Sequence, residues 1–155
     1  MSIEKAISQT KNFKSPYQRM VVNLLYTSSW MNLKQIQLLR PYNLSVSQYN
    51  VLRILRGAYP TPVSTSYIAE RMIDRTSNAS RIVDRLLRKE LVIKEPSAVD
   101  RRIVNILITE KGLDLLAKID VEQDHFEARL HSLTEEKANL LSDLLDELRA
   151  CFQEE

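Results

Sequence analysis

The chain has 155 residues, of which 44% are hydrophobic and 27% charged, a composition that excludes a disordered chain and favours an ordinary globular protein. No stretch approaches the roughly 18 apolar residues of a membrane-spanning helix, and the first residues lack the apolar segment of a signal peptide. The single cysteine, Cys151, cannot form an internal disulfide, so we expect a reducing, cytoplasmic environment and no membrane partner.

Charge is distributed unevenly along the chain. Residues 1–63 contain eight Lys/Arg and one acidic residue, residues 64–112 contain ten and seven, and residues 113–155 contain four and twelve. The basic first and middle parts predict an anionic partner such as nucleic acid. The alternative is that basic and acidic helices pack beside one another, and the two interpretations are compatible.

Residues 15–40 are expected to form one long helix, and residues 1–14 are expected to be a loose basic leader or a frayed first turn. Ser15 is a suitable N-cap, Pro16 fits the first helical position, and Pro41 ends the segment. A helix of about 24 residues would be roughly 36 Å long. This length exceeds what a compact small domain needs, so we expect part of the helix to pack against another subunit.

Two shorter helices follow. Ser45 and Gln48 form a predicted capping box at the start of the first, and Gly57 is expected to end it in a left-handed conformation. Ser64 is expected to cap the second, whose apolar side chains point inward. Those inward side chains are Ile68, Ala69 and Met72.

The helix that ends near Arg88 is amphipathic, and Asp74 and Thr76 are alternative N-caps for it. At 100° per residue its apolar side chains share a sector roughly 120° wide. That sector contains Ala79, Ile82, Val83, Leu86 and Leu87, and the opposite side contains Ser77, Asn78, Ser80, Arg81, Asp84, Arg85 and Arg88. A charged outer face is usually only solvated. Short hydroxyls and an Asn at the N-terminal end, with Arg one turn later, are instead typical of a helix that enters the major groove of DNA.

A β-hairpin and two helices complete the chain. Residues 91–93 form one predicted strand, and a second begins at Ile103 and has apolar residues with a period of two. Thr109 and Thr134 are expected to cap the two last helices. The apolar set of the final helix is Leu141, Leu144, Leu145, Leu148 and Phe152. The predicted fold is mainly α, a winged helix-turn-helix with the order α-α-α-α-β-β-α-α.

The chain resembles the MarR family of bacterial winged-helix transcription regulators over residues 15–150. The resemblance is carried by residues 44–52, 68–72, 80–86, 91–92, 100–102 and 108–112. Its most specific element is Asp100-Arg101-Arg102 followed by a strand and by Thr109-Glu110-Lys111-Gly112. One departure is Glu90, where the family usually has a glycine that would serve as a left-handed C-cap. Either Glu90 adopts that conformation at a cost of about 1–2 kcal/mol, or the helix ends differently.

The resemblance implies a homodimer in which residues 15–40 and 113–152 form dimerisation helices and residues 45–112 form the winged-helix DNA-binding region. A two-fold dimer would place two recognition helices in successive major grooves, about 34 Å apart, on a pseudo-palindromic double-stranded operator. We therefore expect a sequence-specific transcriptional regulator, with repression favoured. Family members often respond to small molecules, so an effector is also expected.

The candidate DNA-binding residues form three groups. The base-reading group comprises Ser77, Asn78, Ser80 and Arg81. Asn pairs best with adenine and Arg with guanine, each worth about 1–3 kcal/mol of discrimination. The phosphate-contacting group comprises Ser64, Thr65, Ser66, Arg75, Thr76 and Arg85. The wing group comprises Arg101 and Arg102, which could enter the minor groove. The alternative is that Asp100 and Arg102 pair to shape the turn, and the family pattern implies a mixed role for Arg102 and the exposed role for Arg101.

Other chemistry is not indicated by the sequence. His125 and His131 lie 240° apart around a helix, so they cannot chelate one metal from one turn, and no metal or cofactor is expected. Cys151 lies on the apolar face of the last helix, which favours a buried small hydrophobe over a redox sensor. No phosphate-binding loop or nucleophile motif is present, so we do not expect an enzyme.

Two alternatives remain open at this stage. Tyr26, Trp30 and Tyr49 could line an effector pocket, although core or interface positions are favoured for them. The rival function is a helical dimeric interaction protein that has the winged-helix fold and does not bind DNA. The basic outer face and the wing arginines favour DNA binding.

Overall fold

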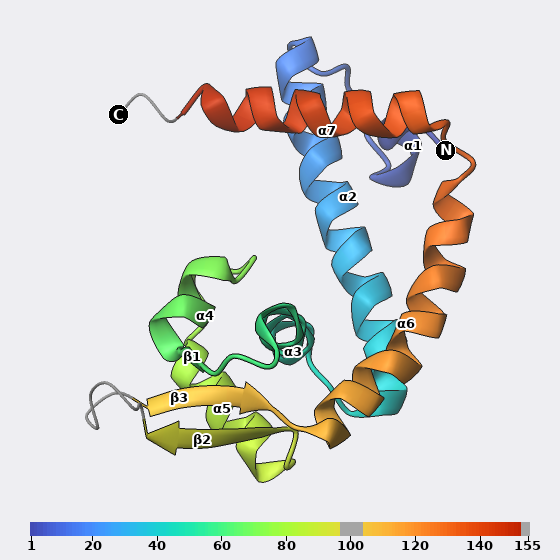
Figure 1. Ribbon diagram of the computed structural model, residues 1–155. Coiled ribbons are helices and arrows are strands. Elements are labelled where there is room, and N and C mark those ends of the chain that lie inside the picture. The colour runs from blue at the N-terminus through green and yellow to red at the C-terminus, as the bar shows by residue number, and fades with distance from the viewer. Residues whose placement is uncertain (97–103, 153–155) are drawn as a thin grey trace. The chain divides into compact units, whose positions relative to one another are not determined.

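The computed structural model describes residues 1–96 and 104–152 (Figure 1). The chain divides into two compact units, residues 1–116 and residues 117–155. The elements in chain order are α1 (Ile3–Ala6), α2 (Pro16–Leu39), the 3-10 helix η1 (Arg40–Tyr42), α3 (Val46–Ala58), β1 (Val63–Ser64), α4 (Thr65–Arg71), α5 (Ala79–Arg88), β2 (Val92–Pro96), β3 (Val104–Ile108), α6 (Glu110–Leu130) and α7 (Glu135–Ala150).

The predicted fold class is confirmed, and the structure adds the 3-10 helix η1 and two further short elements, α1 and β1. Helix α1 forms within the segment predicted to be loose, because Ile3 is buried and Glu4 pairs with Arg19 of α2 at 2.5 Å. Strand β1 has only two residues, too few for a period of two to be visible in the sequence. Both elements are therefore stabilised by contacts with distant parts of the chain.

The three strands form an antiparallel sheet in the order β1-β3-β2. Val63 pairs with Ile106, and Val92 pairs with Ile108. Ile106 and Ile108 are fully buried, whereas Val104 at the outer end of the strand is 45% exposed. The period of two predicted for this strand therefore describes burial only at its inner end.

The predicted N-caps of five helices are confirmed. Ser15, Ser45, Ser64, Thr109 and Thr134 each accept a hydrogen bond from the backbone N–H three residues later. The capping box is complete, since the Gln48 side chain accepts from the Ser45 N–H at 3.1 Å.

The predicted left-handed stop at Gly57 is wrong. Helix α3 continues through Ala58, and its C-cap is Tyr59, with a φ of −56° and a ψ of 137°. Tyr59 precedes Pro60, and a residue before proline is sterically excluded from the helical region. The proline therefore ends the helix, and no left-handed glycine is needed.

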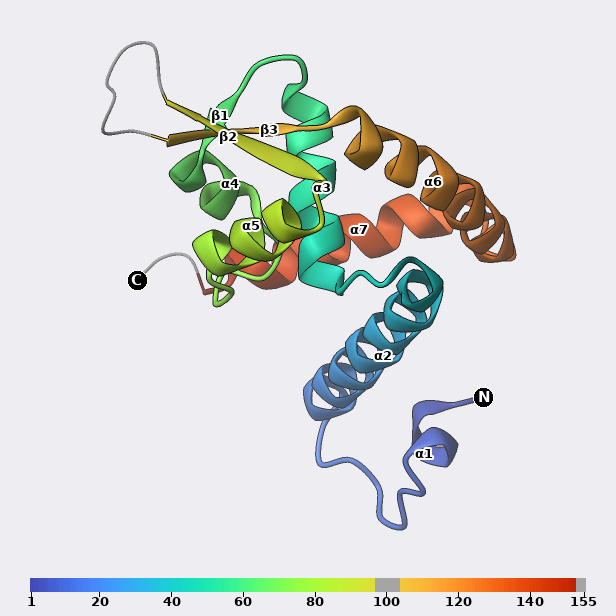
Figure 2. The same cartoon turned by 90° about the horizontal axis from the view of Figure 1, so that it is seen from below.

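The core of the first unit lies between α3, α4, α5 and the sheet, which lie side by side in Figures 1 and 2. Its fully buried side chains include Leu39, Val51, Leu52, Leu55, Ile68, Val83, Leu86, Val92, Ile106 and Ile108. Ala69 was predicted to point inward but is exposed, because Ile68 and Met72 fill that side of α4. This core holds α5 by its apolar face and leaves its polar face outward.

The second unit contains the C-terminal part of α6 and all of α7. No residue of α7 is buried, and Leu140, Leu141 and Leu144 are each at least 50% exposed. Among the described residues, no helix combines the length and the hydropathy that crossing a membrane requires.

Candidate nucleic-acid interface

Helix α5, the candidate recognition helix, begins later than the sequence predicted. Its N-cap is Asn78, whose Oδ1 accepts a hydrogen bond from the Arg81 N–H at 3.0 Å. Neither Asp74 nor Thr76 is the cap, so both predicted alternatives are wrong. The physical reason is that Asp74 caps the preceding turn instead.

The Asp74 carboxylate holds this turn with three hydrogen bonds. Oδ1 accepts from the Thr76 N–H at 3.0 Å and from the Thr76 hydroxyl at 2.7 Å, and Oδ2 accepts from the Ser77 hydroxyl at 2.5 Å. These donors, the Ser77 hydroxyl first and the Thr76 groups second, lower the pKa of Asp74 below its ordinary value. The carboxylate is therefore ionised at neutral pH.

The two faces of α5 largely match the predicted pattern. Ala79, Ile82, Val83 and Leu86 are buried, but Leu87 is 37% exposed because it lies at the edge of the apolar sector. Ser80, Arg81 and Arg85 are exposed, as is Arg75 in the preceding turn. Among the described residues no acid pairs with any of these three arginines. Their guanidinium groups are thus available to an anionic ligand.

The one acid on the outer face of α5 is neutralised by the wing. The Asp84 carboxylate pairs with the Lys94 ammonium of β2 at 2.6 Å, and this contact lowers the pKa of Asp84. The ion pair also ties β2 to α5. The basic surface of the helix is therefore not interrupted by a free negative charge.

The start of α4 presents the predicted group of three hydroxyl residues. Ser64 is the N-cap and accepts from the Tyr67 N–H at 3.2 Å, while its hydroxyl lies 3.0 Å from that of Ser66. Thr65 is half-buried and Ser66 is exposed. One turn later, the Arg71 guanidinium stacks 3.5 Å above the ring of Tyr67. The arginine–tyrosine pair was not among the residues predicted from the sequence.

The end of α5 is a Schellman motif with Glu90 in the left-handed position, at a φ of 59°. The Leu91 N–H donates to the Leu86 carbonyl, and the Glu90 N–H donates to the Leu87 carbonyl. Of the two alternatives for Glu90, the first is confirmed. Its carboxylate pairs with Lys111 at 2.7 Å, which lowers the pKa of Glu90.

Lys89, beside Glu90, adds a contact that the sequence analysis missed. Its ammonium donates to the Asn43 carbonyl and lies 3.5 Å from Oε1 of Gln48, a polar side chain that is buried in the core. The end of the recognition helix is thereby tied to the junction between α2 and α3. No local sequence signal predicts this contact, because the partners are more than 40 residues apart.

The tip of the wing lies outside the described residues. The predicted contacts of Asp100, Arg101 and Arg102 therefore remain predictions. The hairpin itself is confirmed up to its last pair, in which Pro96 lies opposite Val104.

The three aromatic residues considered for an effector pocket occupy different environments. Tyr49 is buried in the core, and its hydroxyl accepts from Arg53 at 3.0 Å. Tyr26 and Trp30 are 42% and 43% exposed on α2. They are therefore not core residues of the single chain.

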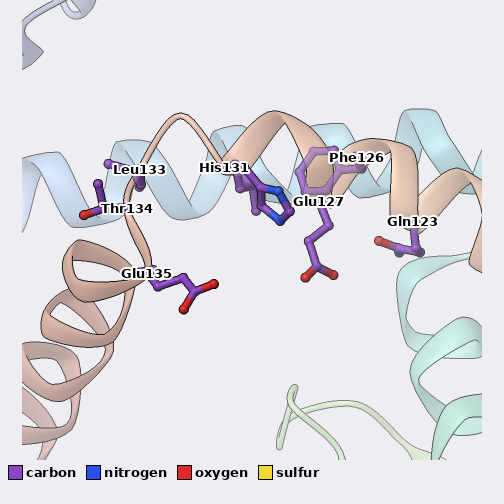
Figure 3. Close-up of a pocket in the computed structure, with 9 residues that line it drawn as sticks. Gln123, Phe126, Glu127, His131, Leu133, Thr134 and Glu135 are labelled. Atoms are coloured by element: carbon purple, nitrogen blue, oxygen red, sulfur yellow. The ribbon is translucent and has the colours of Figure 1, made fainter.

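A hollow of about 700 Å³ lies at the corner between α6 and α7, within the second unit (Figure 3). Phe126, Leu130 and Leu133 provide apolar walls, and the carboxylates of Glu127 and Glu135 point into the same space. None of the three predicted aromatic residues lines it. Across the described residues, no group of three His, Cys, Asp or Glu side chains has metal-binding geometry.

Cys151 is exposed, which contradicts the prediction of a buried residue. It follows the last turn of α7, and its thiol donates to the Glu147 carbonyl at 3.3 Å. The helix face that it was expected to share is itself exposed in the single chain.

Comparison with known proteins identifies the family. The model of the MarR family matches residues 44–104, the segment from α3 to the start of β3. The chain is 30% identical over 115 residues to the HTH-type transcriptional regulator MgrA of Staphylococcus aureus, covering 74% of this chain and 76% of MgrA. The chain belongs to the MarR family.

Other relatives of this MarR-family protein agree with that assignment. The HTH-type transcriptional regulator MhqR of Bacillus subtilis is 29% identical over 107 residues, covering 67% of this chain and 71% of MhqR. The crystal structure of a MarR transcription factor from Planctomyces limnophilus is 31% identical, covers 87% of this chain and 98% of that one, and has a TM-score of 0.63. The S. aureus MepR–DNA complex, at 23% identity and a TM-score of 0.74, shares the fold, covering 90% of this chain and all of that one. The protein is a DNA-binding transcriptional regulator with a winged helix-turn-helix fold.

Proposed function

We propose that this MarR-family regulator binds a pseudo-palindromic operator as a homodimer and represses transcription in the cytoplasm. The observation that carries the proposal is the outer surface of α5 and its preceding turn, where Arg75, Arg81 and Arg85 are exposed and unpaired among the described residues. Three uncompensated guanidinium groups beside a helix start match the phosphates and base edges of a major groove.

The candidate residues have different proposed roles in this complex. Arg81 and Ser80 face outward on the first turn of α5, which supports contacts with base edges. Arg75, Arg85 and the start of α4 at Ser64, Thr65 and Ser66 contact phosphates. Thr76 instead holds the turn, because its N–H and its hydroxyl both donate to Asp74. In the wing, Arg101 enters the minor groove and Asp100 pairs with Arg102.

The dimer is proposed to form through α2, α6 and α7. Only Leu39 is buried in the 24 residues of α2, and no residue of α7 is buried. Large apolar side chains such as Leu25 and Leu33 on α2 and Leu141 on α7 are more than half exposed. Contiguous exposed apolar helix faces of this extent are typical of protein interfaces, and a two-fold partner would cover them.

Repression and relief by a small molecule are supported by relatives. The HTH-type transcriptional repressor IacR of Pseudomonas putida is 30% identical over 111 residues, covering 71% of this chain and 65% of IacR. An organohalide-sensing regulator of the same fold, 22% identical with a TM-score of 0.78, binds 2,4-dichlorophenol. We propose that this protein also responds to a small-molecule effector.

Gel shift with the DNA upstream of the protein's own gene, at controlled salt, tests the proposal. Arg81→Ala should weaken specific binding roughly ten- to hundredfold, since an arginine–guanine contact provides about 1–3 kcal/mol of discrimination. Arg88→Ala is the matched control, because it removes the same charge from the C-terminal end of the same helix. Equal effects of the two variants would contradict base reading by Arg81. Failure of the wild-type protein to bind any duplex DNA would favour the rival interaction protein.

A further inference from the structure

At the start of the recognition helix, neighbouring side chains fix the hydrogen-bond polarity of Ser77, that is, whether its hydroxyl donates or accepts. An ionised carboxylate can only accept hydrogen bonds, so the 2.5 Å contact between Asp74 Oδ2 and Ser77 Oγ requires Ser77 to be the donor. A serine hydroxyl has one hydrogen and two lone pairs. Its hydrogen is therefore committed to Asp74, and only acceptor capacity remains.

A second neighbour, Ser47 of α3, also leaves the Ser77 hydroxyl as an acceptor. The Ser47 hydroxyl of α3 lies 3.5 Å from that of Ser77. Because the Ser77 hydrogen is already donated, Ser47 can only donate to Ser77 across this distance. Ser77 is half-buried, and one lone pair is left for an external ligand.

Asn78 is less constrained than Ser77. Its Oδ1 accepts the capping hydrogen bond from the Arg81 N–H, which uses one of the two lone pairs of this oxygen and does not involve the amide hydrogens of Nδ2. Asn78 can therefore still both donate and accept, and the adenine contact expected from the sequence remains a prediction.

The turn that carries these groups is also held from α3. The Asn50 side chain accepts from the Ile73 N–H at 3.0 Å, one residue before Asp74. Asp74, Thr76 and Ser77 are bonded to each other, and the turn is joined to α3 through Ile73 with Asn50 and through Ser77 with Ser47. The polarity of Ser77 is consequently a property of the folded protein that exists before DNA binds.

We propose that Asp74 is a specificity-determining positioning residue, which makes Ser77 an obligate acceptor that selects an amino-bearing base in the major groove. Adenine N6 and cytosine N4 donate there, whereas guanine and thymine present only acceptors at the equivalent edge. Phosphate oxygens also only accept, so Ser77 is not a phosphate contact. The inference rests on the proposed function, in which the start of α5 reads base edges.

Asp74→Asn tests the proposal because it keeps the shape of the turn and inverts its polarity. The Thr76 N–H still requires an acceptor, which orients the new amide oxygen toward Thr76 and its Nδ2 toward Ser77. The amide then donates to Ser77 Oγ, and the Ser77 hydrogen is no longer donated to residue 74. Ser47, at 3.5 Å, competes only weakly for this hydrogen, so Ser77 can donate it to a base. In a selection from duplex DNA of randomised sequence, wild type should prefer adenine or cytosine at one position of each half-site. The variant should shift that position toward guanine or thymine, by roughly three- to tenfold for one hydrogen bond.

Loss of the Asp74 charge raises affinity for all sequences alike, so the ratio between bases is the quantity to compare. Ser77→Ala should abolish the preference at that position, and Asp74→Asn should then have no further effect on it. The proposal would be overturned if Asp74→Asn left the base ratios unchanged, or if it changed them equally in the Ser77→Ala background.

A second measurement does not depend on DNA. In wild-type protein, NMR titration should find the Asp74 pKa below its ordinary value, and Ser77→Ala should raise it. An Asp74 pKa that does not respond to Ser77→Ala would refute the donor assignment even if the operator is unknown. Absence of any enriched sequence with wild-type protein would instead overturn the proposed function, and with it the role of Ser77.

Discussion

Glu90 occupies a backbone conformation that favours glycine, and its side chain only partly compensates. Its φ of 59° is left-handed, which costs an L-residue about 1–2 kcal/mol. The ion pair with Lys111 joins two exposed side chains, and such pairs contribute about 0.2–1 kcal/mol. The balance favours glycine at this position.

We predict that Glu90→Gly stabilises the protein by about 0.5–1 kcal/mol, because relief of the left-handed strain exceeds the loss of the ion pair. For a chain of this size the melting temperature should rise by roughly 1–4 °C. Glu90→Ala is the control, since it removes the ion pair and keeps a Cβ. A lower melting temperature for Glu90→Gly would show that the ion pair dominates.

Gly112 is required for a different reason, the close approach of neighbouring atoms. A Cβ at this position would lie 2.5 Å from the Leu91 carbonyl oxygen and 2.7 Å from Cγ1 of Ile108. We predict that Gly112→Ala destabilises the protein by about 1–3 kcal/mol, the range of overpacked cores.

Gly57→Ala is the matched control. Gly57 is helical with nothing within 4 Å of the added Cβ, so that variant should gain about 0.5–1 kcal/mol. Urea denaturation of both variants measures the difference, and similar midpoints would contradict the steric explanation.

At the scale of elements, α1 shows how a four-residue helix can be fixed by two contacts. Ile3 is buried, and Glu4 accepts a hydrogen bond from Arg19 on α2. The Arg19 guanidinium lowers the pKa of Glu4 to about 2. A depressed carboxyl pKa stabilises the docked helix above the ordinary pKa of 4.5 and loses this effect as the pH falls toward 2.

We therefore predict that α1 detaches from α2 in the acid range before the winged-helix core unfolds. Amide hydrogen exchange of residues 3–7 should accelerate between pH 4.5 and pH 2. In Glu4→Gln the side chain cannot ionise, so these amides should show only the intrinsic pH dependence of hydrogen exchange. The same acceleration in Glu4→Gln would exclude the Glu4–Arg19 pair as its cause.

The recognition helix shows which features of an element a sequence can predict. Its buried face followed from helical spacing, and four of its five predicted members are buried. The residue at which the helix begins could not be predicted from the sequence, because Asp74, Thr76 and Asn78 are all acceptable N-caps by residue type. Only the folded turn, with Asp74 bonded to Thr76 and Ser77, decides that Asn78 is the cap.

At the scale of the whole molecule, the exposed apolar face of α7 is the feature that a single chain does not explain. Leu141 and Leu144 are 52% and 50% exposed. We predict that Leu144→Asp converts a dimer to a monomer, because an unpaired charge cannot be buried in an apolar interface without a large cost. Ser142→Asp is the control, since it lies 200° around the helix. Sedimentation equilibrium should give 18.0 kDa for Leu144→Asp and twice this mass for wild type and the control.

Operator affinity should fall together with the dimer, because one recognition helix then binds without its partner. A Leu144→Asp variant that remains dimeric, or wild-type protein that sediments as a monomer, would refute the proposed role of α7.

The sequence by itself determined what depends on local chemistry and periodicity. Helix caps at Ser15, Ser45 and Thr134, the apolar face of α5 and the spaced motifs of the MarR family all arise from residues close together in the chain. Tertiary structure decided what depends on distant partners. It placed the two residues of β1 beside β3, bonded Lys89 to Asn43, and oriented the Ser77 hydroxyl through Asp74 and Ser47. Hydrogen-bond polarity belongs to this second class, because a serine or asparagine can donate or accept until its neighbours in space are known.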